Sequence, residues 1–165
     1  MKIAGTIQDS IVDGPGLRFV VFTQGCVHAC PSCHNPETHD INGGTEKSVD
    51  EIITEMRNNP LTDGLTLSGG EPFLQAEPCA VLADAAKANG LNIWVYSGWT
   101  YEELLEKSKT DEDIAALLRL TDVLVDGRFD ETKRSLELRF RGSSNQRLID
   151  LKETFRTGEV AVLES

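Results

Sequence analysis

Three cysteines lie within eight positions of this chain. Cys26, Cys30 and Cys33 form the spacing C-x3-C-x2-C in the segment GCVHACPSCHN. Thiolates are soft ligands, and a short loop that carries three of them can curl around one inorganic centre. A zinc ion takes a fourth ligand, which His28 or His34 can supply. An iron–sulfur cube normally takes four cysteines, so three would leave one iron open to a small molecule.

The composition limits the classes of protein to which the chain can belong. The 165 residues carry 27 acidic against 16 basic side chains, a net charge of −11. Such a surface repels phosphate backbones, so we expect no nucleic-acid partner. No segment approaches the roughly 18 apolar residues of a membrane helix, and the first ten residues lack the apolar run of a signal peptide. We therefore expect a cytoplasmic protein with no membrane partner, a setting in which clustered cysteines favour metal or redox chemistry.

Short apolar runs alternate with amphipathic segments along most of the chain. Strands are predicted at 17–24, 64–70, 91–98 and 121–127, and helices at 48–58, at 77–89, from residue 100 and at 111–120. The last forty residues are expected to hold two short strands around a short helix. Buried strands that alternate with helices form a parallel sheet with right-handed crossovers.

The chain length decides how far such a sheet can close. A βα unit takes roughly 30 residues, so the chain holds about five to six units, whereas a closed eightfold barrel takes roughly 250 residues. We therefore predict a single α/β domain over residues 1–165, a partial, open (β/α) barrel with a mostly parallel sheet.

Four polar or glycine-rich segments each follow a predicted strand directly. They are the cysteine loop, SGGEP, YSGW and DGRF. Because parallel strands present their carboxyl ends at one edge of a sheet, where α/β proteins place their chemistry, these segments are expected to form one site. DGPG at residues 13–16 is expected to be a turn before the strand at 17–24.

The three-cysteine spacing resembles that of the radical S-adenosylmethionine superfamily. The segments IVDGPGLR, SGGEP, DVLVDGRF and RGSSNQR are similar to those of the anaerobic ribonucleotide reductase activating proteins, and this resemblance covers nearly the whole chain. It implies an oxidoreductase whose catalytic residues Cys26, Cys30 and Cys33 hold a 4Fe–4S cluster. The open iron of that cluster would be chelated by S-adenosylmethionine, so His28 and His34 are not needed as ligands.

The resemblance also assigns residues to the second cofactor. SGGEP would bind the methionine ammonium of S-adenosylmethionine, and a guanidinium after the fourth strand matches its carboxylate. The cofactor-binding residues are thus expected to be Ser32, Cys33, His34, Gly69, Gly70, Glu71, Ser97 and Arg128. The alternatives are purely structural roles: a tight turn at SGGEP, and strand-end packing or a surface ion pair at Ser97 and Arg128. The serines and asparagine of RGSSNQR are expected to support the cofactor or a partner.

The activity implied by the resemblance is that of a glycyl-radical-generating activase. It would cleave S-adenosylmethionine reductively to a 5′-deoxyadenosyl radical and generate a glycyl radical on anaerobic ribonucleoside-triphosphate reductase, with a flavodoxin-type electron donor. One alternative is another small radical enzyme, similar to pyruvate formate-lyase activase or to 7-carboxy-7-deazaguanine synthase. A second alternative is a zinc-binding interaction module.

The fourth cysteine, Cys79, is not expected to be a ligand. It shares a helix face at spacing i, i+3, i+4, i+7 with three apolar residues, Leu82, Ala83 and Ala86. A cysteine in that pattern packs as a small core hydrophobe.

Overall fold

The computed structural model describes residues 1–28, 30, 33 and 36–163, and a sheet of seven strands forms its centre. The strand order is β3-β1-β2-β4-β5-β6-β7, and the strands at the two ends of this order do not pair with each other. Four neighbouring strands are parallel: β2 (Arg18–Thr23), β4 (Gly64–Gly69), β5 (Asn92–Tyr96) and β6 (Val123–Asp126). The outer strands are antiparallel: β1 (Lys2–Ser10), β3 (Thr45–Glu46) and β7 (Arg147–Asp150). The predicted open α/β sheet with mostly parallel strands is confirmed.

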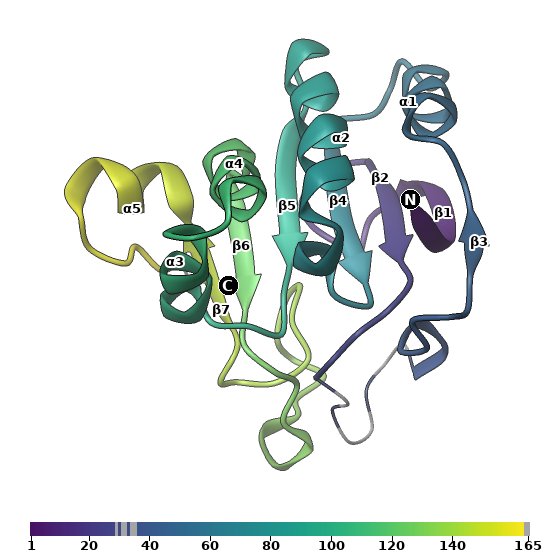
Figure 1. Ribbon diagram of the computed structural model, residues 1–165. Helices are drawn as coiled ribbons and strands as arrows, with labels where there is room; N and C mark the ends of the chain where they lie inside the picture. The colour runs from purple at the N-terminus through teal and green to yellow at the C-terminus, as the bar shows by residue number, and fades with distance from the viewer. Residues whose placement is uncertain (29, 31–32, 34–35, 164–165) are drawn as a thin grey trace.

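Helices connect the parallel strands and pack on the sheet. The α-helices are α1 (Val49–Arg57), α2 (Ala76–Ala88), α3 (Tyr101–Ser108), α4 (Glu112–Leu120) and α5 (Leu151–Thr157). Short 3₁₀ helices are η1 (Pro36–Thr38), η2 (Pro72–Gln75) and η3 (Glu131–Lys133). Figure 1 shows α1, α2 and α4 on the near face of the sheet. No helix in the described part of the chain has the length and apolar character needed to cross a bilayer.

The two faces of the sheet bury different sets of side chains. Leu65, Leu67 and Ile93 pack in one large core with the inner face of α2. Trp94 and Val125 point the other way and join a smaller cluster. This division follows from the two-residue period of a strand, which sends successive side chains to opposite faces.

Local signals in the sequence place the helix starts correctly. Ser48 caps α1 by accepting a hydrogen bond from the Glu51 amide at 3.1 Å. Thr100 and Glu103 form a reciprocal capping box at the start of α3. Each side chain satisfies an amide that the first helical turn leaves unpaired, which explains why these residue types mark the boundary.

Several parts of the fold were not anticipated from the sequence, including the two-residue strand β3. The edge strand β1 was not predicted, because its sequence KIAGTIQDS shows no continuous apolar run. In the structure most of its side chains are partly or fully exposed. In the last forty residues β7 is followed by α5 as expected. The second expected strand is reduced to one bridge between Val162 and Ile149.

The turn at residues 11–17 is fastened to the sheet by Arg18. Its fully buried guanidinium donates to the Thr66 hydroxyl at 2.7 Å and to the Pro15 and Leu65 carbonyls at 2.9 Å. Thr66 in turn donates to the Asp13 carbonyl at 2.7 Å. Burial lowers the pKa of Arg18 to about 10. The predicted DGPG turn is therefore held over the face of the sheet that bears Trp94.

Arg147 stabilises the junction of β6, β7 and α3. It binds the buried carboxylate of Asp126, with Nε 3.0 Å from Oδ1, and reaches Glu102 at 2.7 Å. Asp126 also accepts from the Tyr101 amide at 2.8 Å. We expect Arg147→Met to lower the free energy of unfolding by about 3 kcal/mol, because the substitution leaves a buried charge without its cation.

The matched control is Arg156→Met on α5, whose partner Glu153 is exposed. Exposed ion pairs contribute little to stability, so this change should be small. Urea unfolding curves of both variants measure the difference. Equal losses for the two arginines would contradict the role given to Arg147.

Candidate functional site

The carboxyl ends of β2, β4, β5 and β6 lie at one edge of the sheet, and the loops that follow them surround a cavity. These ends point toward the bottom of Figure 1. The cavity has a volume of about 390 Å³. Its lining includes Val12, Asp13, Cys26, His28, Cys30, Cys33, Ser68, Gly69, Gly70, Ser97, Gly98, Phe129, Phe140, Arg141 and Gln146. The strand-end segments predicted to form one site therefore do lie together.

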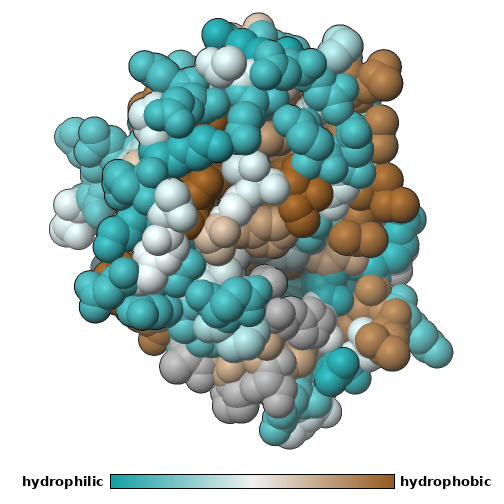
Figure 2. Space-filling model, turned by 90° about the vertical axis from the view of Figure 1, so that its right-hand side faces the viewer, coloured by the Kyte–Doolittle hydropathy of each residue, from teal (hydrophilic) through white to brown (hydrophobic). Residues whose placement is uncertain are grey.

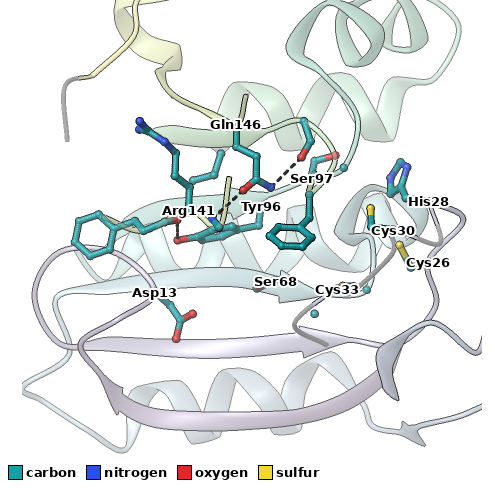
Figure 3. Close-up of a pocket in the computed structure, with 18 of the residues that line it drawn as sticks. Asp13, Cys26, His28, Cys30, Cys33, Ser68, Tyr96, Ser97, Arg141 and Gln146 are labelled. Carbon is teal, nitrogen blue, oxygen red and sulfur yellow. Dashed lines mark hydrogen bonds between the residues drawn. The ribbon is translucent and has the colours of Figure 1, made fainter. Parts of the chain in front are cut away.

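All three clustered cysteines are partly buried and line this cavity. Figure 3 shows them at one end of it, beside His28, with Asp13 and Arg141 toward the other end. Among the described residues, no group of three or more His, Cys, Asp or Glu side chains is arranged to hold a single metal ion. Three thiols that line one cavity together with Gly69 and Gly70 fit a larger thiolate-bound group such as an iron–sulfur cluster.

The base of the cysteine loop is closed by backbone hydrogen bonds. The Gly25 amide donates to the Thr38 carbonyl at 2.6 Å, and the Cys26 amide donates to the His39 carbonyl at 3.1 Å. The Gln24 side chain donates to two further carbonyls of the returning segment, at 3.0 and 2.8 Å. The loop therefore leaves β2 and returns beside it, which keeps its thiols over the edge of the sheet.

The SGGEP turn packs directly against that loop. The Glu71 amide donates to the Gly25 carbonyl at 2.8 Å. A Cβ added to Gly70 would lie 2.3 Å from the same carbonyl oxygen and 2.9 Å from the Thr38 carbonyl oxygen. No side chain fits at that separation, so glycine at position 70 is required by the packing of the two loops as well as suited to a ligand.

The surroundings of Cys30 contribute effects that raise the pKa of its thiol and effects that lower it. Burial raises the pKa of Cys30, and the nearby Cys33 adds to that rise. A hydrogen bond from the Phe129 backbone and the charge of Arg128 oppose it. The loop after β6 therefore lies close to the cysteine loop, although more than ninety residues separate the two in the sequence.

The cofactor-binding residues predicted from the sequence differ in their placement. Gly69, Gly70 and Ser97 line the cavity. Glu71 is completely buried, with its carboxylate directed at protein groups. Arg128 lies 3.4 Å from Glu103 and lines a separate cavity of about 400 Å³. Two of the predicted positions, Ser32 and His34, lie outside the described residues.

One wall of the cavity was missed by reasoning from strand ends. It is formed by Phe140, Arg141 and Gln146, from the long loop between β6 and β7. Phe140 has a left-handed backbone with φ 63°, and its carbonyl accepts from the Tyr96 hydroxyl at 2.6 Å. Figure 3 shows this wall beside Tyr96 and Ser97. The RGSSNQR motif was the signal for it, although the motif alone does not show which side chains reach the cavity.

Within RGSSNQR, several polar groups hold the loop itself. The Gln146 side chain accepts from the Gly142 and Ser143 amides at 2.9 and 3.1 Å and donates to the Gly127 carbonyl at 3.0 Å. The Asn145 amide group donates to the Arg128 carbonyl at 2.8 Å. These bonds tie the returning loop to the end of β6.

Comparison with known proteins identifies the family. A family model described as a 4Fe-4S single cluster domain matches residues 12–149, a range that contains the cysteine loop. The anaerobic ribonucleoside-triphosphate reductase-activating protein of Vibrio cholerae is 37% identical over 144 residues, covering 82% of this chain and 89% of that protein. Proteins of the same name from Escherichia coli K12 and enterobacteria phage T4 are 37% and 32% identical, with 82% and 83% of this chain and 90% and 86% of the relatives covered.

Among solved structures, QueE from Escherichia coli is similar to part of the chain. The TM-score is 0.48 and the identity 18%, over 60% of this chain and 53% of that one. The alignments to the sequence relatives cover most of this chain and most of each relative, and the family model covers more than half of the chain. The chain therefore belongs to the family of anaerobic ribonucleoside-triphosphate reductase-activating proteins and contains a 4Fe–4S single cluster domain.

Proposed function

We propose that this protein activates an anaerobic ribonucleoside-triphosphate reductase by generating a glycyl radical on it, at the expense of S-adenosylmethionine. The observation that carries the proposal is the division of the four cysteines. Cys26, Cys30 and Cys33 line the cavity at the edge of the sheet, whereas Cys79 lies in the core. Three protein ligands leave one iron of a 4Fe–4S cluster for the amino and carboxylate groups of S-adenosylmethionine.

When bound, the cluster would supply one electron to the sulfonium of S-adenosylmethionine, and the carbon–sulfur bond would break homolytically. The products would be methionine and a 5′-deoxyadenosyl radical. That radical would take a hydrogen atom from a glycine of the reductase. The chain itself contributes position. The three cysteines hold the cluster at one end of the cavity, and a flavodoxin-type protein is proposed as the electron donor. Because thiolate ligands persist in a reducing compartment, we place this activity in the cytoplasm.

The second cofactor is proposed to lie along the ends of β4, β5 and β6. Gly69 and Gly70 offer backbone groups for the methionine ammonium, and Ser97 lines the same cavity. Arg128 is the cation proposed to face the methionine carboxylate, since its charge already acts on Cys30. It would exchange its exposed contact with Glu103, a pair of little energetic value. Ser32 and His34 are proposed to contribute backbone groups from the cysteine loop.

A glycine-bearing loop of the reductase is proposed to enter the cavity from the end opposite the cysteines. Asp13, Phe140 and Arg141 line that part, and Val12 beside them is 71% exposed. Figure 2 shows apolar side chains along the right-hand edge of one face and also in its middle, with hydrophilic side chains above and to the left. A partner loop seated there would exclude water from the reacting groups without a lid from this chain.

Anaerobic reconstitution with iron and sulfide tests the proposal. We expect a brown protein with about four irons and four sulfides per chain. With a reductant it should convert S-adenosylmethionine to methionine and 5′-deoxyadenosine, and with the reductase present it should give a glycyl radical signal by electron spin resonance. Pyruvate formate-lyase is the control partner and should give no signal. A colourless protein that holds one zinc ion would refute the proposal.

A further inference from the structure

The carboxylate of Glu71 is completely buried and has four protein donors around it. Its Oε1 lies 2.7 Å from His28 Nε2, 2.8 Å from the Ser97 hydroxyl and 2.8 Å from the Gly98 amide nitrogen. Its Oε2 accepts from the Phe73 amide at 3.0 Å. The same carboxylate oxygen accepts from Ser97 and Gly98, so the imidazole is taken as the donor in the first of these bonds. Three of the four donors converge on Oε1 and one binds Oε2, so protein groups surround the carboxylate.

These donors come from three different loops. His28 belongs to the cysteine loop after β2, Phe73 to the turn after β4, and Ser97 and Gly98 to the turn after β5. One buried group therefore joins the ends of three neighbouring parallel strands. Hydrogen bonds to a buried charge are among the stronger ones in proteins, because water does not compete for them.

The imidazole of His28 occupies a fitted slot. Its side chain is 3% exposed, and its ring meets the ring of Trp99 edge-on, with centroids 4.9 Å apart. A Cβ added to Gly98 would lie 2.3 Å from Cδ2 of the imidazole. In the sequence His28 stands between Cys26 and Cys30, two residues from each. Whatever fixes this ring also limits where the two flanking thiols can lie.

We propose that Glu71 and His28 are positioning residues, which fasten the cysteine loop to the turns after β4 and β5 before any cofactor binds. Glu71 then acts through its protein partners, and the methionine ammonium is bound by backbone groups of the SGGEP turn rather than by the carboxylate. The second half of this proposal rests on the proposed function. The first half concerns the shape of the protein alone.

The first experiment uses the cluster-free protein and three forms of position 28. His28→Phe keeps a ring against Trp99 but removes the donor, whereas His28→Gln keeps an N–H near the place of Nε2. Hydrogen exchange is measured at the Gly25 and Cys26 amides, which close the base of the loop. We expect exchange about tenfold faster in His28→Phe and close to wild type in His28→Gln, with β4 unchanged. Equal exchange in all three forms would overturn the positioning role, whether or not a cluster binds.

The second experiment separates the charge of Glu71 from its acceptor role. Glu71→Gln retains an oxygen for His28, Ser97 and Gly98 and removes the negative charge, while its NH2 group replaces the oxygen that accepts from the Phe73 amide. After reconstitution, S-adenosylmethionine is titrated while the spin-resonance spectrum of the reduced cluster is recorded. We expect an affinity within about threefold of wild type, whereas loss of a direct ion pair to the ammonium would weaken it by about tenfold or more. The latter result, with loop exchange unchanged, would overturn the proposed role of the carboxylate.

The matched control is Glu51→Gln, at an exposed position in the first turn of α1. It removes the same charge far from the loops and should change neither exchange nor affinity. The rate at which iron is lost to a chelator provides a further readout. His28→Phe should lose iron about tenfold faster than wild type, whereas His28→Gln, which keeps an N–H for Glu71, should lose it at about the wild-type rate. Equal rates of iron loss for the two variants would contradict the role of this bond.

Discussion

We expect Cys30→Ala to abolish both cluster retention and cleavage of S-adenosylmethionine, the largest effect of any substitution considered for this chain. Cys30 is one of three cavity-lining thiols. With only two cysteines left, a second iron of the proposed cluster would have no protein ligand. Iron and sulfide content after anaerobic reconstitution, together with formation of 5′-deoxyadenosine, measures both losses. Far-ultraviolet circular dichroism should remain that of the wild type, because the side chain belongs to a loop and not to the core.

Cys79→Ala is the matched control. Cys79 is fully buried on the inner face of α2, and burial raises the pKa of its thiol to about 12, so it stays protonated at neutral pH. We expect this variant to lose about 1 kcal/mol of stability through the small cavity left behind. It should keep the cluster and the cleavage activity. Loss of cleavage by a normally folded Cys79→Ala protein would show that the ligands are assigned wrongly.

Gly70→Ala is expected to have the second largest effect. The new Cβ would lie 2.3 Å from the Gly25 carbonyl oxygen, which is backbone and cannot move without displacing the start of the cysteine loop. Overpacking of this kind costs about 1–3 kcal/mol. We expect cluster content after reconstitution to fall by about tenfold, because the displaced loop no longer presents its thiols together. Urea unfolding and iron analysis measure the two effects.

Gly5→Ala is the control for Gly70→Ala. Gly5 also lies at the sheet, in β1, but a Cβ added there meets nothing within 4 Å. The expected change in stability is within about 0.5 kcal/mol, with full cluster content. If both variants load the cluster equally well, the close approach at Gly70 does not control the cysteine loop.

Much of the site could be predicted because the relevant signals are local. The apolar runs and capping residues place four parallel strands and the helices between them, as at Ser48 and Thr100. Parallel strands bring their carboxyl ends to one edge whatever the details of packing. The cysteine loop, SGGEP and YSGW were therefore expected together, and all three contribute to the cavity.

The partners of individual side chains were decided only by the tertiary structure. Glu71 and His28 are 43 positions apart, and nothing within either motif indicates that one binds the other. The guanidinium chemistry of Arg128 indicated the methionine carboxylate of S-adenosylmethionine as its partner. In the fold, Arg128 contacts the carboxylate of Glu103. Edge strand β1 and the Phe140 wall likewise depend on long-range pairing.

The physical reason is the distance along the chain over which each kind of interaction acts. Alternation of apolar residues, capping and glycine turns act over a few neighbouring residues, so the sequence by itself determined the elements and the edge at which the thiols meet. Which loops touch depends on how helices and strands pack, and packing sets contacts between residues that are distant in the chain. Only the folded protein could therefore show that the buried carboxylate of Glu71 joins three loops around the candidate cluster site.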